Sequence, residues 1–176
     1  VINPSTPEEW EVLRYELSHF VCEGEYKSGL QRILTAYLGN MHETKQPAIW
    51  VSGFYGSGKS HFVRVLEYLW RDTVFPDKAR ARSLANLPNE IADLLLELTT
   101  VGKREGGLWS AAGTLGAGTG KSVRLALLSI LFRSAGLPEQ YAPARFVIWL
   151  MQNGYYKDVK AEVERLGADF ARQLNN

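Results

Sequence analysis

Gly53-Phe54-Tyr55-Gly56-Ser57-Gly58-Lys59-Ser60 is the stretch on which the expected fold of this chain depends. It matches G-x-x-x-x-G-K-[ST], the pattern of a phosphate-binding loop. Residues 48–51 before it are apolar and partly β-branched, which predicts a buried strand. Apolar residues recur at helical spacing over residues 62–70, which predicts a helix. Strand, glycine loop and helix in this order are the context that the pattern requires.

The residue types in this loop predict how it would bind a polyphosphate. Glycine lets a backbone approach phosphate oxygens without a Cβ clash, and amides at a helix N-terminus attract anions. Lys59 is the expected catalytic contact to the β- and γ-phosphates, and the Ser60 hydroxyl the expected Mg²⁺ contact. We expect Mg-ATP as the ligand. Its expected binding residues are Gly53, Tyr55, Gly56, Ser57, Gly58, Lys59, Ser60 and His61. The alternative is a glycine-rich turn that ends a strand and binds nothing.

Composition narrows the class of protein. With 176 residues, of which 45% are apolar and 22% charged, the chain can build one globular core. The net charge of +1, with mixed signs, gives no electrostatic footprint for nucleic acid. A single cysteine, Cys22, allows no internal disulfide or thiolate metal cluster and fits a reducing cytoplasm. No apolar run approaches the ~20 residues of a membrane-spanning helix.

Several helices are expected around the loop. Thr6, Pro7 and Glu9 form a capping box with proline at the first helical position, so a helix should begin there. A second should end near Gly39. Further helices are expected over residues 87–101, 122–134 and from Pro143 to Gly154, and a last one over residues 155–174, broken at Gly167.

Two groups of residues allow more than one interpretation. Phe20, Val21 and Tyr26 could cover a nucleotide base, although we favour core or surface aromatics. Lys78, Arg80 and Arg82 could form a basic patch for nucleic acid. A solvated connector is the favoured interpretation, because Asp72 and Asp77 lie beside only three cations.

Glycine is concentrated in residues 106–120, and its role there stays open. Residues 108–111 could form a strand. Residues 116–122 resemble a second phosphate loop but fail on spacing, because Leu115 stands where the pattern needs its first glycine. We therefore interpret this stretch as a loop that caps the next helix.

Hydrolysis would need an acidic residue for Mg²⁺, typically an aspartate at the end of an apolar strand. The apolar run over residues 146–151 ends in Gln152-Asn153-Gly154 and is better interpreted as a buried helix. The predicted fold is α/β, a P-loop NTPase of the AAA+/ORC-like kind, helix-rich and incomplete. We divide it into a helical lead-in, residues 1–47, and a partial nucleotide-binding domain, residues 48–176, truncated before the second acidic motif.

Residues 51–62, Val-Ser-Gly-Phe-Tyr-Gly-Ser-Gly-Lys-Ser-His-Phe, resemble the large P-loop ATPases of BREX phage-defence systems, the BrxC/PglY type. Residues 20–26, 113–118 and 134–141 resemble that family more weakly. The resemblance covers most of this chain but only the N-terminal part of such a protein. It implies an ATP-binding, oligomerising intracellular protein that works with a methyltransferase and other BREX proteins against phage DNA. Lys59 and Ser60 carry over as the phosphate and Mg²⁺ contacts.

Two other functions compete with a defence ATPase. One is a nucleotide-gated scaffold that binds ATP without turnover and presents helices to a partner. The other is a small-molecule kinase, which would need a lid of arginines, whereas Arg145 and Arg165 are scattered.

Overall fold

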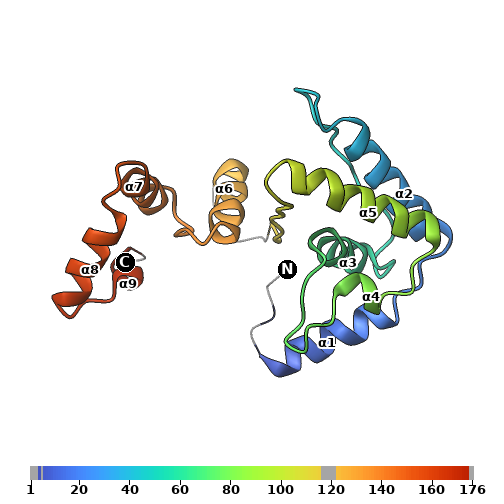
Figure 1. Cartoon of the computed structure of the whole chain (residues 1–176), viewed down its shortest axis with the longest axis horizontal. Helices are drawn as coiled ribbons and strands as arrows, with labels where there is room; N and C mark the ends of the chain where they lie inside the picture. Colours follow the sequence, from blue (N-terminus) through green and yellow to red (C-terminus); the bar gives the residue numbers. More distant parts are fainter. Residues whose placement is uncertain (1–3, 5, 116–121, 175–176) are drawn as a thin grey trace. The chain divides into compact units, whose positions relative to one another are not determined.

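A computed structural model describes residues 4, 6–115 and 122–174 of the chain. By their internal contacts the described residues separate into two compact units, one up to residue 110 and the other from residue 111 onward. The first unit contains α1 (Pro7–Ser18), α2 (Gly24–Gly39), α3 (Lys59–Arg71), α4 (Ala81–Leu84) and α5 (Asn89–Arg104). The second contains α6 (Val123–Ser134), α7 (Tyr141–Gln152), α8 (Tyr156–Arg165) and α9 (Phe170–Leu174) (Figure 1).

The prediction of an α/β P-loop NTPase fold is wrong for this structure. The described residues contain helices but no strand, and their one β-type pairing is an isolated bridge between Val74 and Arg80. A strand bonds its backbone to a neighbouring strand, and no described segment offers one to residues 48–51. Residues 42–57 are all exposed, so the apolar run before the loop is not buried either. Residues 108–111, the second possible strand, also have no regular structure.

The helix predictions hold, because they rest on local signals. Thr6 caps α1, and its side chain and that of Glu9 exchange bonds with each other's backbone amides, as a capping box does. Ser122 caps α6 by accepting from the Leu125 amide. The apolar run of residues 146–151 lies inside α7, as expected. Gly167, with φ of 79°, separates α8 from α9. Residues 116–121, the rejected second loop, lie outside the described residues.

The core of the first unit forms where α1, α2, α3 and α5 meet. It consists of fully buried aliphatic side chains from all four helices: Leu13, Leu17, Leu30, Leu34, Val65, Leu69, Ile91, Leu95 and Leu98. Each contributes about 1.5–3 kcal/mol relative to exposure. A Cβ at Gly29 of α2 would lie 3.2 Å from the Phe62 ring of α3, so these two helices approach closely at that point. This contact fixes α2 beside the start of α3.

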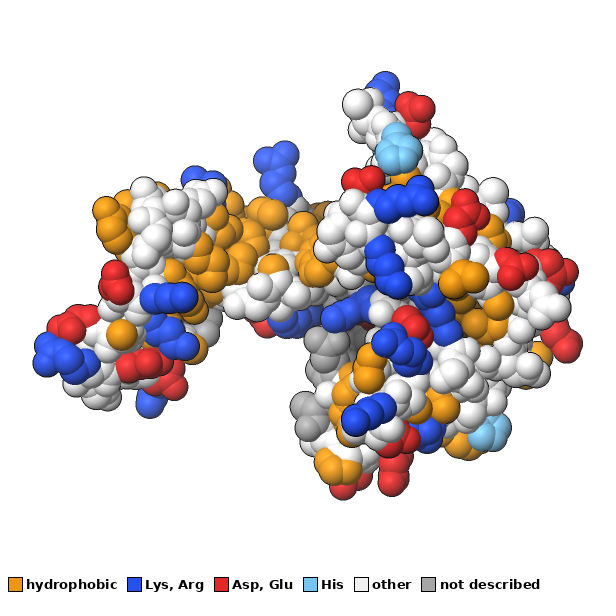
Figure 2. All heavy atoms as spheres, viewed as in Figure 1, with side chains coloured by type: hydrophobic (Ala, Val, Ile, Leu, Met, Phe, Trp, Pro, Cys, Tyr) orange, Lys and Arg blue, Asp and Glu red, His pale blue; other side chains and the backbone are white. Residues whose placement is uncertain are grey.

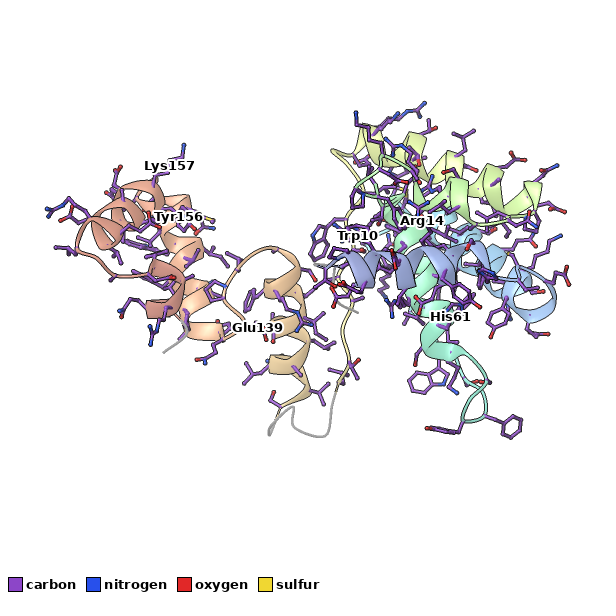
Figure 3. The ribbon with its side chains drawn as sticks, turned by 90° about the horizontal axis from the view of Figure 1, so that it is seen from below. Trp10, Arg14, His61, Glu139, Tyr156 and Lys157 are labelled. Atoms are coloured by element: carbon purple, nitrogen blue, oxygen red, sulfur yellow. The ribbon has the colours of Figure 1, made fainter. Side chains whose placement is uncertain are left out.

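The connector after α3 is fastened to the rest of the unit. Phe75 packs against Trp10 at 5.1 Å between ring centroids, and the Arg14 guanidinium lies over the Phe75 ring. Arg14 also pairs with Asp77 at 2.6 Å. Figure 3 labels Trp10 and Arg14 on α1. These contacts hold the return path of the chain against α1.

The second unit has a smaller core. Its buried apolar side chains are Ala144, Val147, Leu150 and Phe170. Apolar side chains also remain exposed on α6 and α7, among them Val123, Leu125, Phe146 and Trp149, and Figure 2 shows hydrophobic atoms gathered over these helices.

The sequence predicts a nucleotide-binding domain that begins at residue 48. The two units are defined by contacts alone and not by nucleotide binding, so this division stays a prediction.

Candidate phosphate-binding site

The loop over residues 53–58 turns sharply and leads directly into α3. The Ser57 amide donates to the Phe54 carbonyl at 3.2 Å, which closes the turn. Gly56 and Gly58 have φ of 80° and 79°, a left-handed conformation that favours glycine. The Phe62 amide donates to the Gly58 carbonyl at 2.8 Å and makes the first bond of α3. The predicted loop and helix therefore form without the predicted strand.

Lys59, the first residue of α3, folds its side chain back over the loop. Its Nζ donates to the Gly53 carbonyl at 2.8 Å, to the Phe54 carbonyl at 2.5 Å and to Ser57 Oγ at 3.2 Å. An ammonium group has three N–H donors, and these three acceptors match them. The loop thus holds a positive charge beside its own backbone.

The backbone amides at the start of α3 are open. Gly58, the N-cap, supplies no side-chain acceptor. Within the described residues, the amides of Gly58, Lys59, Ser60 and His61 have no recorded hydrogen-bond acceptor. The first amides of any helix lack intrahelical partners, and they carry the positive end of the helix dipole. The arrangement is one that can receive an anion.

Tyr26, on α2, supports the loop from a position 31 residues earlier in the chain. Its hydroxyl donates to the Ser57 carbonyl at 3.1 Å. The same hydroxyl occupies the place that a Cβ at Gly58 would need. Its ring also lies 5.7 Å from the rings of Phe20 and Phe62. Sequence reasoning considered Tyr26 only as a possible cover for a base and missed this role. The one signal for it is the glycine at residue 58.

The other predicted contacts differ in their surroundings. Tyr55 is fully exposed, and Gly56 and Ser60 are also exposed. The His61 ring, at the start of α3 in Figure 3, lies 5.9 Å from the Phe20 ring. Phe20 is buried, as the favoured interpretation expected, whereas Val21 is exposed.

A cavity of about 870 Å³ adjoins the loop. One wall comes from α2 and the other from residues 47–54. Gly53, Ser57 and Lys59 line it as well, so the lysine lies at its boundary. The candidate site is therefore a loop together with an adjoining hollow.

The donor set can be tested against the two expected ligands. Open amides beside an ammonium group fit a polyphosphate, which offers only acceptors. For Mg²⁺ the exposed Ser60 hydroxyl is the candidate protein ligand, because Mg²⁺ commonly takes few protein oxygens and completes its shell with phosphate and water. The described residues contain no cluster of three or more His, Cys, Asp or Glu side chains able to hold a metal ion by themselves.

The basic stretch after α3 serves the structure of the unit. Arg80 pairs with Asp72 at 3.1 Å. The Arg82 guanidinium donates to the carbonyls of Leu69, Trp70 and Leu95 and to Thr99 Oγ1, at 2.6–3.0 Å. Two of the three cations are thus engaged within the protein, which favours the connector interpretation over a nucleic-acid patch.

No protein-family model matches the chain, and no solved structure is significantly similar to it. Among the described residues, none of the helices combines the length and the apolar character that crossing a membrane requires.

Proposed function

We propose that the 53–60 loop and the first turn of α3 bind the polyphosphate of ATP together with Mg²⁺. The observation that carries the proposal is that one loop combines the Lys59 ammonium, held against residues 53–57, with four open amides, those of residues 58–61. A charge-assisted bond from N–H to a phosphate oxygen is about twice as strong as a neutral one. The loop and the first turn of α3 offer several such donors.

Binding would exchange one set of Lys59 contacts for another. The carbonyls of Gly53 and Phe54 now accept from Lys59 Nζ, and phosphate oxygens, which carry full negative charge, would compete for the same donors. The amides would receive the phosphate without conformational change at Gly58, whose left-handed φ already directs the chain into the helix. The Ser60 hydroxyl would complete the site by binding Mg²⁺.

Calorimetric titration of the full chain with Mg-ATP tests this proposal. Lys59→Ala should weaken binding at least tenfold, because it removes the only side-chain cation of the loop. Lys45→Ala, at an exposed lysine of the same unit, is the matched control and should bind as the native chain does. Equal affinity for Lys59→Ala and the native chain would refute the proposal.

The resemblance of residues 51–62 to BREX defence ATPases extends the proposal to a cellular role. In it, the chain belongs to a cytoplasmic, oligomeric ATPase that acts with a methyltransferase and other BREX proteins against phage DNA. In cells carrying a complete system of this kind, Lys59→Ala should abolish phage restriction and Lys45→Ala should preserve it. Phosphate release by the complete protein separates an ATPase from a scaffold that binds ATP without turnover.

A further inference from the structure

The cavity beside the loop is larger than a phosphate requires. Its volume of about 870 Å³ lies within the range of small-molecule sites, about 300–1,000 Å³. A phosphate held at Lys59 would touch only the boundary of this space. The remaining volume extends between α2 and residues 47–54.

The walls of the cavity combine apolar surface with a few polar groups. Ile33 and Ala36 contribute apolar surface from α2, and Ile49 and Trp50 contribute it from the opposite wall. Trp50 is 89% exposed, so the indole is accessible to a ligand. This mixture is typical of sites that hold an aromatic or heterocyclic ligand.

Two charged side chains of α2 also line the cavity. Glu25 and Arg32 are seven residues apart, two helical turns, and so lie on the same face of α2. Neither takes part in an ion pair recorded within the described ranges. A carboxylate accepts from hydroxyl and amino groups, and a guanidinium donates to ring nitrogens and carbonyl oxygens. Both residues are exposed, so polar groups of a ligand in the cavity can reach them.

We propose that this cavity takes the nucleoside part of the ligand, so that base and ribose lie between α2 and residues 47–54 while the phosphates lie at Lys59. This inference rests on the proposed function, since the phosphate end sets which ligand enters. Trp50 supplies a stacking surface for the base. Glu25 and Arg32 supply an acceptor and donors for its polar groups and those of the ribose.

Inorganic tripolyphosphate and ATP, each with Mg²⁺, are the two probes that test the cavity. The native chain should bind ATP at least tenfold more tightly than tripolyphosphate. ATP should quench tryptophan fluorescence, tripolyphosphate should not, and Trp50→Phe should remove most of the quenching. Because indole stacking on a base is lost, Trp50→Ala should weaken ATP binding about tenfold and leave tripolyphosphate binding unchanged.

A larger side chain in the wall tests the same inference independently. Ala36→Trp should reduce the affinity for ATP to that for tripolyphosphate without changing the latter. Ala92→Trp, at an exposed position of α5, is the control and should change neither. Trp50→Ala keeps the test decisive if Ala36→Trp fails to fold, because residue 50 packs little surface against the protein.

The outcomes separate this inference from the proposed function. Equal affinities for ATP and tripolyphosphate, both lost in Lys59→Ala, would overturn the nucleoside cavity and leave the phosphate site in place. ATP binding that is unaffected by both Ala36→Trp and Trp50→Ala would overturn it too. If the native chain bound neither probe, both proposals would fail.

Discussion

The contact between Tyr26 and the loop predicts that Gly58→Ala destabilises the protein in two separable ways. Alanine at a φ of 79° costs about 1–2 kcal/mol relative to an ordinary helical conformation. Its Cβ would also displace the Tyr26 hydroxyl from the Ser57 carbonyl. That hydrogen bond contributes about 1 kcal/mol. We therefore expect the free energy of unfolding to fall by about 2–3 kcal/mol.

Tyr26→Phe separates the two costs. By itself it removes the bond to Ser57 and should lower the free energy of unfolding by about 1 kcal/mol. In its presence the nearest remaining ring atom, Cζ, lies 3.4 Å from the Cβ of an alanine at residue 58, an ordinary contact. Gly58→Ala should then cost only the conformational term, about 1–2 kcal/mol. The double-mutant cycle should give a coupling energy of about 1 kcal/mol.

Urea unfolding of the four full-length chains, followed by circular dichroism and tryptophan fluorescence, measures this coupling. Trp70 is a useful reporter because it packs edge-to-face against Tyr37 in the same unit, at 4.4 Å between ring centroids. Costs that add to within about 0.5 kcal/mol would refute the contact, since independent sites behave in that way. So would a larger cost of Gly58→Ala in the Tyr26→Phe background.

Three further predictions concern the first unit. Arg82→Ala should lower the free energy of unfolding by about 2–4 kcal/mol, because it removes four hydrogen bonds that join the end of α3 to the middle of α5. Urea unfolding measures the loss, and Lys103→Ala on the exposed face of α5 should change little. Burial raises the pKa of Glu67 above its ordinary value, so ionisation opposes folding. The stability of the native chain relative to Glu67→Gln should therefore fall as the pH rises through and above the ordinary carboxyl range; a constant difference between pH 4 and 7 would contradict this. Burial also raises the pKa of the Cys22 thiol, so a thiol reagent should modify the native chain far more slowly than the urea-unfolded chain, and equal rates would show that Cys22 is accessible.

Local signals predicted part of the candidate site well. A glycine-rich pattern followed by helical periodicity led to a turn with Gly56 and Gly58 at positive φ and a helix that begins at Lys59. These features depend on residues within one or two turns of each other, so short-range sterics and hydrogen bonding are enough to specify them. The role of Tyr26 could not be predicted in this way. It depends on α2 packing against α3, where Gly29 meets Phe62.

The strand predicted over residues 48–51 did not form, because a strand depends on more than local signals. Residues 48–51 have the composition of a buried strand, yet composition only makes a segment suitable for a sheet, and pairing needs a second segment at the right place. The described residues contain no such segment, so the apolar side chains of Ile49 and Trp50 stay exposed.

The amino-acid order by itself determined the longer helices, the caps of α1 and α6 and the turn of the 53–60 loop, because each is set by interactions between near neighbours in the chain. It did not indicate the short helix α4. Tertiary structure alone decided which helix supports the loop, that Arg82 joins α3 to α5, and that a cavity of about 870 Å³ lies beside Lys59. Those features join residues that are far apart in the chain, and only the packing of apolar faces brings them together.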